Sequence, residues 1–159
     1  IATPVVETSV YVDNQAIVHD DATLRGPVVI GPDSVIGPQA VVGPDTAIGQ
    51  NVTVEAGAVV ASSVIDDDTR IGPNATIAEC VTGQDAVIDA GTTIPGGDAD
   101  VRIGTRVHED VTLGGVIADR THVGGGTTLA PGVLIGPNAT IHPGSHIHSN
   151  VCEGMEVRE

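Results

Sequence analysis

The sequence of 159 residues contains no lysine, phenylalanine or tryptophan, and it has a single tyrosine and a single methionine. A hydrophobic core must therefore be assembled from small and branched aliphatic side chains. Hydrophobic residues make up 40% of the chain, which is too many for a disordered acidic tail. At this length they are enough for one domain with a core of its own.

Positive charge is also scarce. Six arginines stand against 21 acidic residues, and the formal net charge is −15. Nucleic acids and anionic membrane surfaces bind to basic patches that neutralise their phosphates. We therefore expect neither a nucleic-acid partner nor a membrane partner.

Long apolar runs and closely spaced cysteines are missing as well. No apolar stretch approaches the roughly 20 residues of a transmembrane helix, and no signal peptide opens the chain. The two cysteines, Cys80 and Cys152, are far apart in the sequence, so we expect free thiols and a cytoplasmic location. The chain begins at Ile1 and has no initiator methionine, and we expect it to be part of a longer protein.

What the sequence does contain is a strict period of six. Ten successive hexads begin with an aliphatic residue: Val6, Val12, Val18, Leu24, Ile30, Ile36, Val42, Ile48, Val54 and Val60. The period returns at Val123, Leu129, Ile135, Ile141 and Ile147. An α-helix repeats at about 3.6 residues, so these side chains would spiral around its surface. A short strand followed by a bend, repeated three times per coil, explains the period and places each of these residues inside a triangular prism.

Glycine and proline mark the bends between these strands. Gly-Pro pairs begin at Gly31, Gly37, Gly43, Gly72 and Gly136. We expect the glycine of each pair to supply a positive φ and the proline to hold φ at about −65°. The fifth residue of each hexad, such as Ala22 or Ala40, is often small and should pack near the corner of the prism.

Two kinds of irregularity interrupt the period. Segments 60–65 and 77–82 are each one residue short, so the next aliphatic position comes early and Cys80 leans inward. A longer break at 95–112 has Gly104 and Thr105 between flanking aliphatic residues, which predicts a hairpin arm that leaves the coil.

The predicted fold is all-β: a parallel β-helix of hexapeptide repeats, with about eight coils at ~4.8 Å each. Regular coils should span residues 5–94, the arm 95–112, further coils 113–151 and a C-terminal tail 152–159.

Several motifs occur in an order that is more specific than the period. They are the two short steps, Asp89–Ile94, Leu113–Asp119, Leu129–Gly136 and Val151–Val157. In this order they resemble the C-terminal domain of archaeal, haloarchaeal-like sugar-1-phosphate nucleotidyltransferases of the glucose-1-phosphate thymidylyltransferase type. The resemblance covers nearly the whole chain. It implies a left-handed β-helix that serves oligomerisation or regulation in an enzyme making dTDP- or UDP-sugars.

The same resemblance implies partners that lie outside this sequence. The catalytic N-terminal domain of the family is Rossmann-like and binds Mg²⁺, and its Gly-rich loop and lysines are absent here. We therefore expect no cofactor in this fragment. The resemblance also implies a homo-oligomer, either a trimer or a dimer of trimers.

Some relatives use the β-helix as an acetyl-CoA-dependent N-acetyltransferase for glucosamine-1-phosphate or another amino sugar, and this is the alternative function. Their His-x-x-Tyr and Ala-Asn-Leu-Arg motifs correspond here to Pro73–Thr76 and to the segment from Pro95. The general base and the polar asparagine are thus replaced, so we expect no complete catalytic site. His122, a corner residue before the wide turn Gly124–Gly126, is the remaining catalytic candidate.

The remaining candidates each have two interpretations. Arg102, Arg106 and His108 form a basic cluster in the arm, for contact with CoA or phosphate or with carboxylates of a neighbouring subunit. The run Asp66–Asp68 is either a solvated turn or a calcium site. Three histidines could bind zinc across a trimer interface, as in γ-class carbonic anhydrases, although we favour solvated or interface side chains: His142, His146 and His148.

Acidic residues fall mainly at positions expected to face outward, such as Asp33, Asp45, Asp85 and Asp119. Acidic surfaces remain hydrated in a salt-rich cytoplasm, where ions screen their mutual repulsion. We expect assembly or folding to be lost at low salt.

Overall fold

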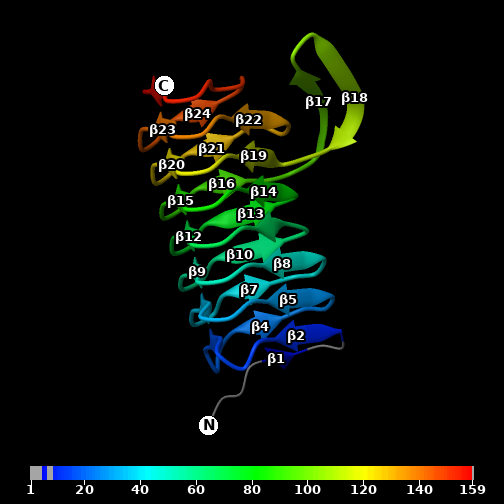
Figure 1. Ribbon diagram of the computed structural model, residues 1–159, viewed down its shortest axis with the longest axis vertical. Coiled ribbons are helices and arrows are strands. Elements are labelled where there is room, and N and C mark those ends of the chain that lie inside the picture. The colour runs from blue at the N-terminus through cyan, green and yellow to red at the C-terminus, as the bar shows by residue number, and fades with distance from the viewer. Residues whose placement is uncertain (1–4, 7–8, 159) are drawn as a thin grey trace.

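The computed structural model describes residues 5–6 and 9–158, and every regular element in this part of the chain is a β-strand. Three parallel sheets of eight, seven and eight strands form the walls of a solenoid (Figure 1). A separate two-stranded sheet projects from it as the arm. The prediction of an all-β parallel helix of about eight coils is confirmed. These residues include no helix that is long and apolar enough to span a membrane.

Successive strands visit the three walls in turn, so each wall collects about every third strand. Sheet A contains β1 (Val5–Val6), β4 (Thr23–Leu24), β7 (Val41–Val42), β10 (Val59–Ala61), β13 (Thr76–Ala78), β16 (Thr93–Ile94), β21 (Thr128–Leu129) and β24 (His146–Ile147). Sheet B contains β2 (Val10–Val12), β5 (Val28–Ile30), β8 (Thr46–Ile48), β11 (Val64–Ile65), β14 (Cys80–Thr82), β19 (Gly115–Ile117) and β22 (Val133–Ile135). Sheet C contains β3 (Ile17–Val18), β6 (Val35–Ile36), β9 (Thr53–Val54), β12 (Arg70–Ile71), β15 (Val87–Ile88), β20 (His122–Val123), β23 (Thr140–Ile141) and β25 (Glu156–Val157).

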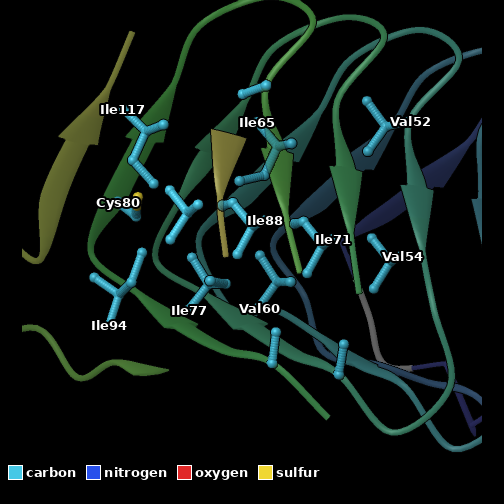
Figure 2. Close-up of a cluster of buried hydrophobic side chains, with 14 of the residues drawn as sticks. Val52, Val54, Val60, Ile65, Ile71, Ile77, Cys80, Ile88, Ile94 and Ile117 are labelled. Atoms are coloured by element: carbon cyan, nitrogen blue, oxygen red, sulfur yellow. The ribbon is translucent and has the colours of Figure 1, made fainter. Parts of the chain in front are cut away.

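The aliphatic residues of the hexads stack inside the prism and form the core (Figure 2). In sheet A the register pairs Leu24 with Val42 and Val42 with Val60, and all three are at most 1% exposed. The small fifth residues, such as Ala22 and Ala40, are fully buried beside them, as predicted. Because each coil contributes only such short side chains, large aromatic rings would overfill the interior.

Glycine in the Gly-Pro pairs has a different cause from the one we expected. Of the five glycines only Gly43 has a positive φ; in the other pairs the left-handed residue comes two positions later, as at Asp33 and Asn74. A Cβ on Gly31 would lie 2.5 Å from the carbonyl oxygen of Gly49 in the next coil. These glycines are therefore required because neighbouring coils approach closely. Aspartate and asparagine take the left-handed position because their short polar side chains tolerate it.

Both short steps fall where the sequence predicts them. Ile65 pairs with Thr82 in sheet B, and both side chains are buried, as is Cys80. The missing residue shortens the turn from sheet A to sheet B, which we call the A–B corner.

The arm is an antiparallel hairpin of β17 (Asp98–Ile103) and β18 (Arg106–Thr112), inserted at the A–B corner between β16 and β19. Glu79, in the second short step, holds both of its ends. The amide of Gly97 donates to the Glu79 carboxylate at 2.6 Å, and the amide of Gly114 donates to the Glu79 carbonyl at 2.6 Å. The arm predicted at 95–112 thus has a fixed root and a projecting tip (Figure 1).

The C-terminal tail expected at 152–159 contains a last strand of the solenoid. β25 pairs in parallel with β23, with Ile141 opposite Val157. The six-residue pattern missed this strand because Val157 comes 16 residues after its partner, and a regular coil would place it 18 residues later.

Candidate functional site

The basic residues of the arm do not share one face. His108 lies opposite Val101, and Arg106 lies opposite Ile103, so Arg106 and His108 are on the same face of the hairpin. Arg102 lies opposite Val107 on the other face. All three are exposed, and none forms an ion pair with a residue that the structure describes.

A groove of about 370 Å³ separates the arm from the last coil. Its lining includes Asp100, Arg102, His148 and Asn150. The Asn150 amide donates to the Arg102 carbonyl at 3.3 Å, and Val101 is buried close to Gly132. The groove thus brings together two of the candidates, Arg102 and His148, which are far apart in the sequence.

His122 lies in β20 on the outer face of sheet C, and the prediction that it is a corner residue is wrong. The six-residue period was broken by the arm, which hid its position in the coil. Its Nε2 atom is 2.6 Å from Oδ2 of Asp89, and both side chains are about half exposed. A carboxylate that orients an imidazole is a geometry suited to a general base. Sequence reasoning missed Asp89 because it lies 33 residues upstream.

The glycines after His122 have a structural explanation. A Cβ on Gly124 would lie 2.5 Å from the backbone nitrogen of Pro143, and Gly126 has a φ of 70°. The turn is therefore glycine-rich because of coil packing and backbone conformation.

The three C-terminal histidines separate into two places. The rings of His146 and His148 are packed edge to face with their centroids 5.0 Å apart. His142 instead contacts the carboxylate of Glu156, which also accepts from Arg158 at 2.7 Å. The hydrogen bond from His142, and after it that from Arg158, lowers the pKa of Glu156. Among the described residues, no three His, Cys, Asp or Glu side chains are grouped so that they could hold a metal ion.

Carboxylates in Asp66–Asp68 are used within the solenoid. Asp67 accepts from the backbone amide of Gln50 at 2.7 Å. Asp68 accepts from the side chains of Asn51 at 2.8 Å and Gln84 at 3.2 Å, and these bonds, Asn51 first, lower its pKa. The run therefore joins adjacent coils. It belongs to a set that we call the acidic corner, at the turns from sheet B to sheet C: Asp33, Asp66, Asp67, Asp68, Asp85, Asp119 and Glu153.

The two cysteines form no disulfide and have different environments. Cys152 is exposed, whereas burial raises the pKa of the Cys80 thiol to about 12. A thiol with so high a pKa is unreactive near neutral pH.

Sequence reasoning missed the outward face of sheet B. One outward residue from each of its seven strands pairs in register with the next, and all seven are apolar. We call this set the apolar row: Tyr11, Val29, Ala47, Val64, Val81, Val116 and Leu134. The equivalent row of sheet C contains Arg70, His122 and Glu156. A period of 18 in the outward positions was the signal that could have revealed it.

The apolar row is open to solvent. Tyr11 is 62% exposed and Val64 is 52% exposed. At the N-terminal end of the row lies a shallow groove of about 500 Å³, lined by residues that include Tyr11, Val29 and Val64. Contiguous exposed apolar surface of this kind is typical of an interaction site.

Comparison with known families agrees with this architecture. The profile of the GMPPB C-terminal domain matches residues 24–118, and the profile of the bacterial transferase hexapeptide (six repeats) matches residues 114–149. The hexapeptide match, together with the three parallel sheets, confirms the left-handed β-helix. No curated protein sequence matches the chain.

Solved structures with this fold include several transferases. UDP-N-acetylglucosamine acyltransferase from Francisella novicida is 17% identical with a TM-score of 0.65, covering 91% of this chain and 56% of that chain. A hexapeptide transferase family protein from Anaplasma phagocytophilum is 20% identical with a TM-score of 0.56, covering 93% and 75%. The acetyltransferase domain of PglB from Neisseria gonorrhoeae, in complex with acetyl coenzyme A, is 21% identical with a TM-score of 0.51, covering 90% and 54%.

The chain spans about half the length of the first and third of these proteins. At such low identity the likeness concerns the fold alone. The family profile is more specific, since it matches more than half of the chain. The chain therefore belongs to the GMPPB C-terminal domain family of hexapeptide-repeat β-helices.

Proposed function

We propose that this β-helix is the C-terminal domain of a sugar-1-phosphate nucleotidyltransferase of the glucose-1-phosphate thymidylyltransferase type, in an archaeal cytoplasm. Its role is to hold copies of the enzyme together as a trimer or a dimer of trimers. Nucleotide and sugar phosphate bind with Mg²⁺ in an N-terminal domain outside this sequence. The observation that carries the proposal is the family match over residues 24–118. The uncharged apolar row along one wall supports the assembly role.

The test uses the complete gene product that contains this chain. It should release pyrophosphate from a nucleoside triphosphate and glucose-1-phosphate when Mg²⁺ is present, with dTTP preferred over UTP, CTP and GTP. A product without a nucleotidyltransferase domain before Ile1, or without pyrophosphate release, would contradict the proposal.

A second function is favoured by one observation, the 2.6 Å contact between His122 and Asp89. In an N-acetyltransferase, Asp89 would orient the imidazole and His122 would take a proton from the attacking amine of an amino sugar phosphate. Incubation with acetyl-CoA and glucosamine-1-phosphate tests this function through the release of free thiol. The first proposal expects none. Thiol release that His122→Asn abolishes and His146→Asn preserves would establish the second.

A further inference from the structure

The apolar row runs the length of the solenoid on a molecule that is otherwise strongly acidic. None of the residues in the seven strands of sheet B carries a charge. Neighbouring members of the row are stacked at the strand spacing of about 4.8 Å. With a net charge of −15 on each copy, two copies can approach closely only through a face that lacks charge.

The two edges of sheet B have opposite electrostatic character. The arm leaves from the A–B corner, and its tip, residues 102–108, contains Arg102, Arg106 and His108 and no carboxylate. The opposite edge is the acidic corner. Asp119 follows β19 directly after the arm, so one member of the acidic corner lies in the coil into which the arm returns.

Building on the proposed role in assembly, we propose that copies of this chain form a ring around an axis parallel to the solenoid. Sheet B of each copy faces that axis, and the arm tip of each copy contacts the acidic corner of the next.

Symmetry determines which edges meet. In a ring with parallel solenoids, going round the axis always brings the arm edge of one copy beside the acidic edge of the next. An antiparallel pair joined through sheet B would place arm beside arm and acid beside acid. The parallel ring therefore gives each arm tip carboxylate partners and removes the apolar row from water, and a second copy supplies both.

The experiment measures the mass of the 159-residue chain by sedimentation velocity in molar KCl. The wild-type chain should sediment as a multiple of 16.0 kDa. Val64→Asp, in the centre of the apolar row, should shift it to the monomer. Val35→Asp makes the same change at an exposed position on sheet C and should leave the mass unchanged. Thermal unfolding of both variants checks that each is folded.

The arm contact is tested separately. Arg102→Glu combined with Arg106→Glu should weaken association about tenfold, and raised KCl should reduce the difference. Arg70→Glu, on the outer face of sheet C, is the matched control and should have no effect on association.

Each result decides a different part. A monomeric wild-type chain overturns the ring and the assembly role together, while pyrophosphate release by the complete enzyme would still support the nucleotidyltransferase assignment. An oligomer that Val64→Asp leaves intact, or that Val35→Asp dissociates, overturns the sheet B contact but preserves homo-oligomerisation. Unchanged association in the double arginine variant overturns the arm contact.

Discussion

The wall of the solenoid and the arm are both built from β-strands, but they are stabilised differently. Wall strands of two or three residues pair with coils on both sides, and each buries an aliphatic residue. The arm strands have six and seven residues, one partner each, and nine consecutive exposed residues from 102 to 110. Stability of the wall is collective, as in other repeat proteins, whereas the arm can vary without loss of the fold.

The largest expected difference comes from the same substitution in the two regions. Ile88→Ala removes a fully buried side chain from the wall and should lower the free energy of unfolding by about 2–5 kcal/mol. Ile103→Ala, at a position that is 59% exposed in the arm, should change it by less than about 0.5 kcal/mol. Urea unfolding of both variants measures the contrast. Equal losses would mean that the arm belongs to the cooperative core.

Glycine substitutions give a smaller contrast. A Cβ on Gly72 would lie 2.6 Å from the backbone nitrogen of Ala90, so Gly72→Ala should cost about 1–3 kcal/mol through displacement of the next coil. Gly104→Ala at the arm tip meets no atom within 4 Å and should cost about 1 kcal/mol, from its φ of 62° alone. Melting temperatures of the two variants provide the comparison. A smaller loss for Gly72→Ala than for Gly104→Ala would show that the coils can separate easily.

Glu79 joins the two regions, and its removal should affect mainly the arm. Glu79→Ala deletes the acceptor for the Gly97 amide, a loss of about 1.5–3 kcal/mol for a bond to a charged group. Hydrogen exchange should accelerate at Gly97 and through residues 98–112, while the coils before residue 77 remain protected. Glu79→Gln retains an acceptor and is the control. Unchanged exchange in the arm of Glu79→Ala would mean that packing at Val101 holds the arm without Glu79.

The smallest effect concerns pH and the acidic corner. Side-chain hydrogen bonds from Asn51 and then Gln84 lower the pKa of Asp68 from its ordinary value of 3.8. A lowered pKa in the folded state stabilises the fold above the ordinary value. That stability is lost as the pH falls below 3.8 and through the folded-state pKa.

The measurement is urea unfolding of the wild-type chain and of Asp68→Asn between pH 2 and pH 7. Asp68→Asn should remove a small part of the acid sensitivity of the wall. The arm carboxylate Asp98 provides the control substitution Asp98→Asn, because the pKa of Asp68 should not depend on it. Identical pH profiles for the wild-type chain and Asp68→Asn would contradict a stabilising role for the hydrogen bonds to Asp68.

The sequence alone was sufficient to predict the inward rows, both short steps and the arm. Each depends on local spacing: an aliphatic residue six positions after the last, or a residue missing from a hexad. Local spacing did not reveal why glycine precedes proline at Gly31, because the close contact is with a residue of the next coil. It also assigned His122 to a corner, since the arm had interrupted the period.

By itself, then, the sequence determined a coiled β-structure of narrow cross-section, because the inward positions repeat within one coil and select aliphatic side chains. Only the tertiary structure decided which outward side chains meet. Two short steps and one long insertion change the number of residues per coil, so partners are separated by 17 residues at Asp67 and Gln50 but by 33 at His122 and Asp89. The same stacking collected one apolar residue from every coil of sheet B into a row. No single hexad contains that row, since it exists only once the coils are in register.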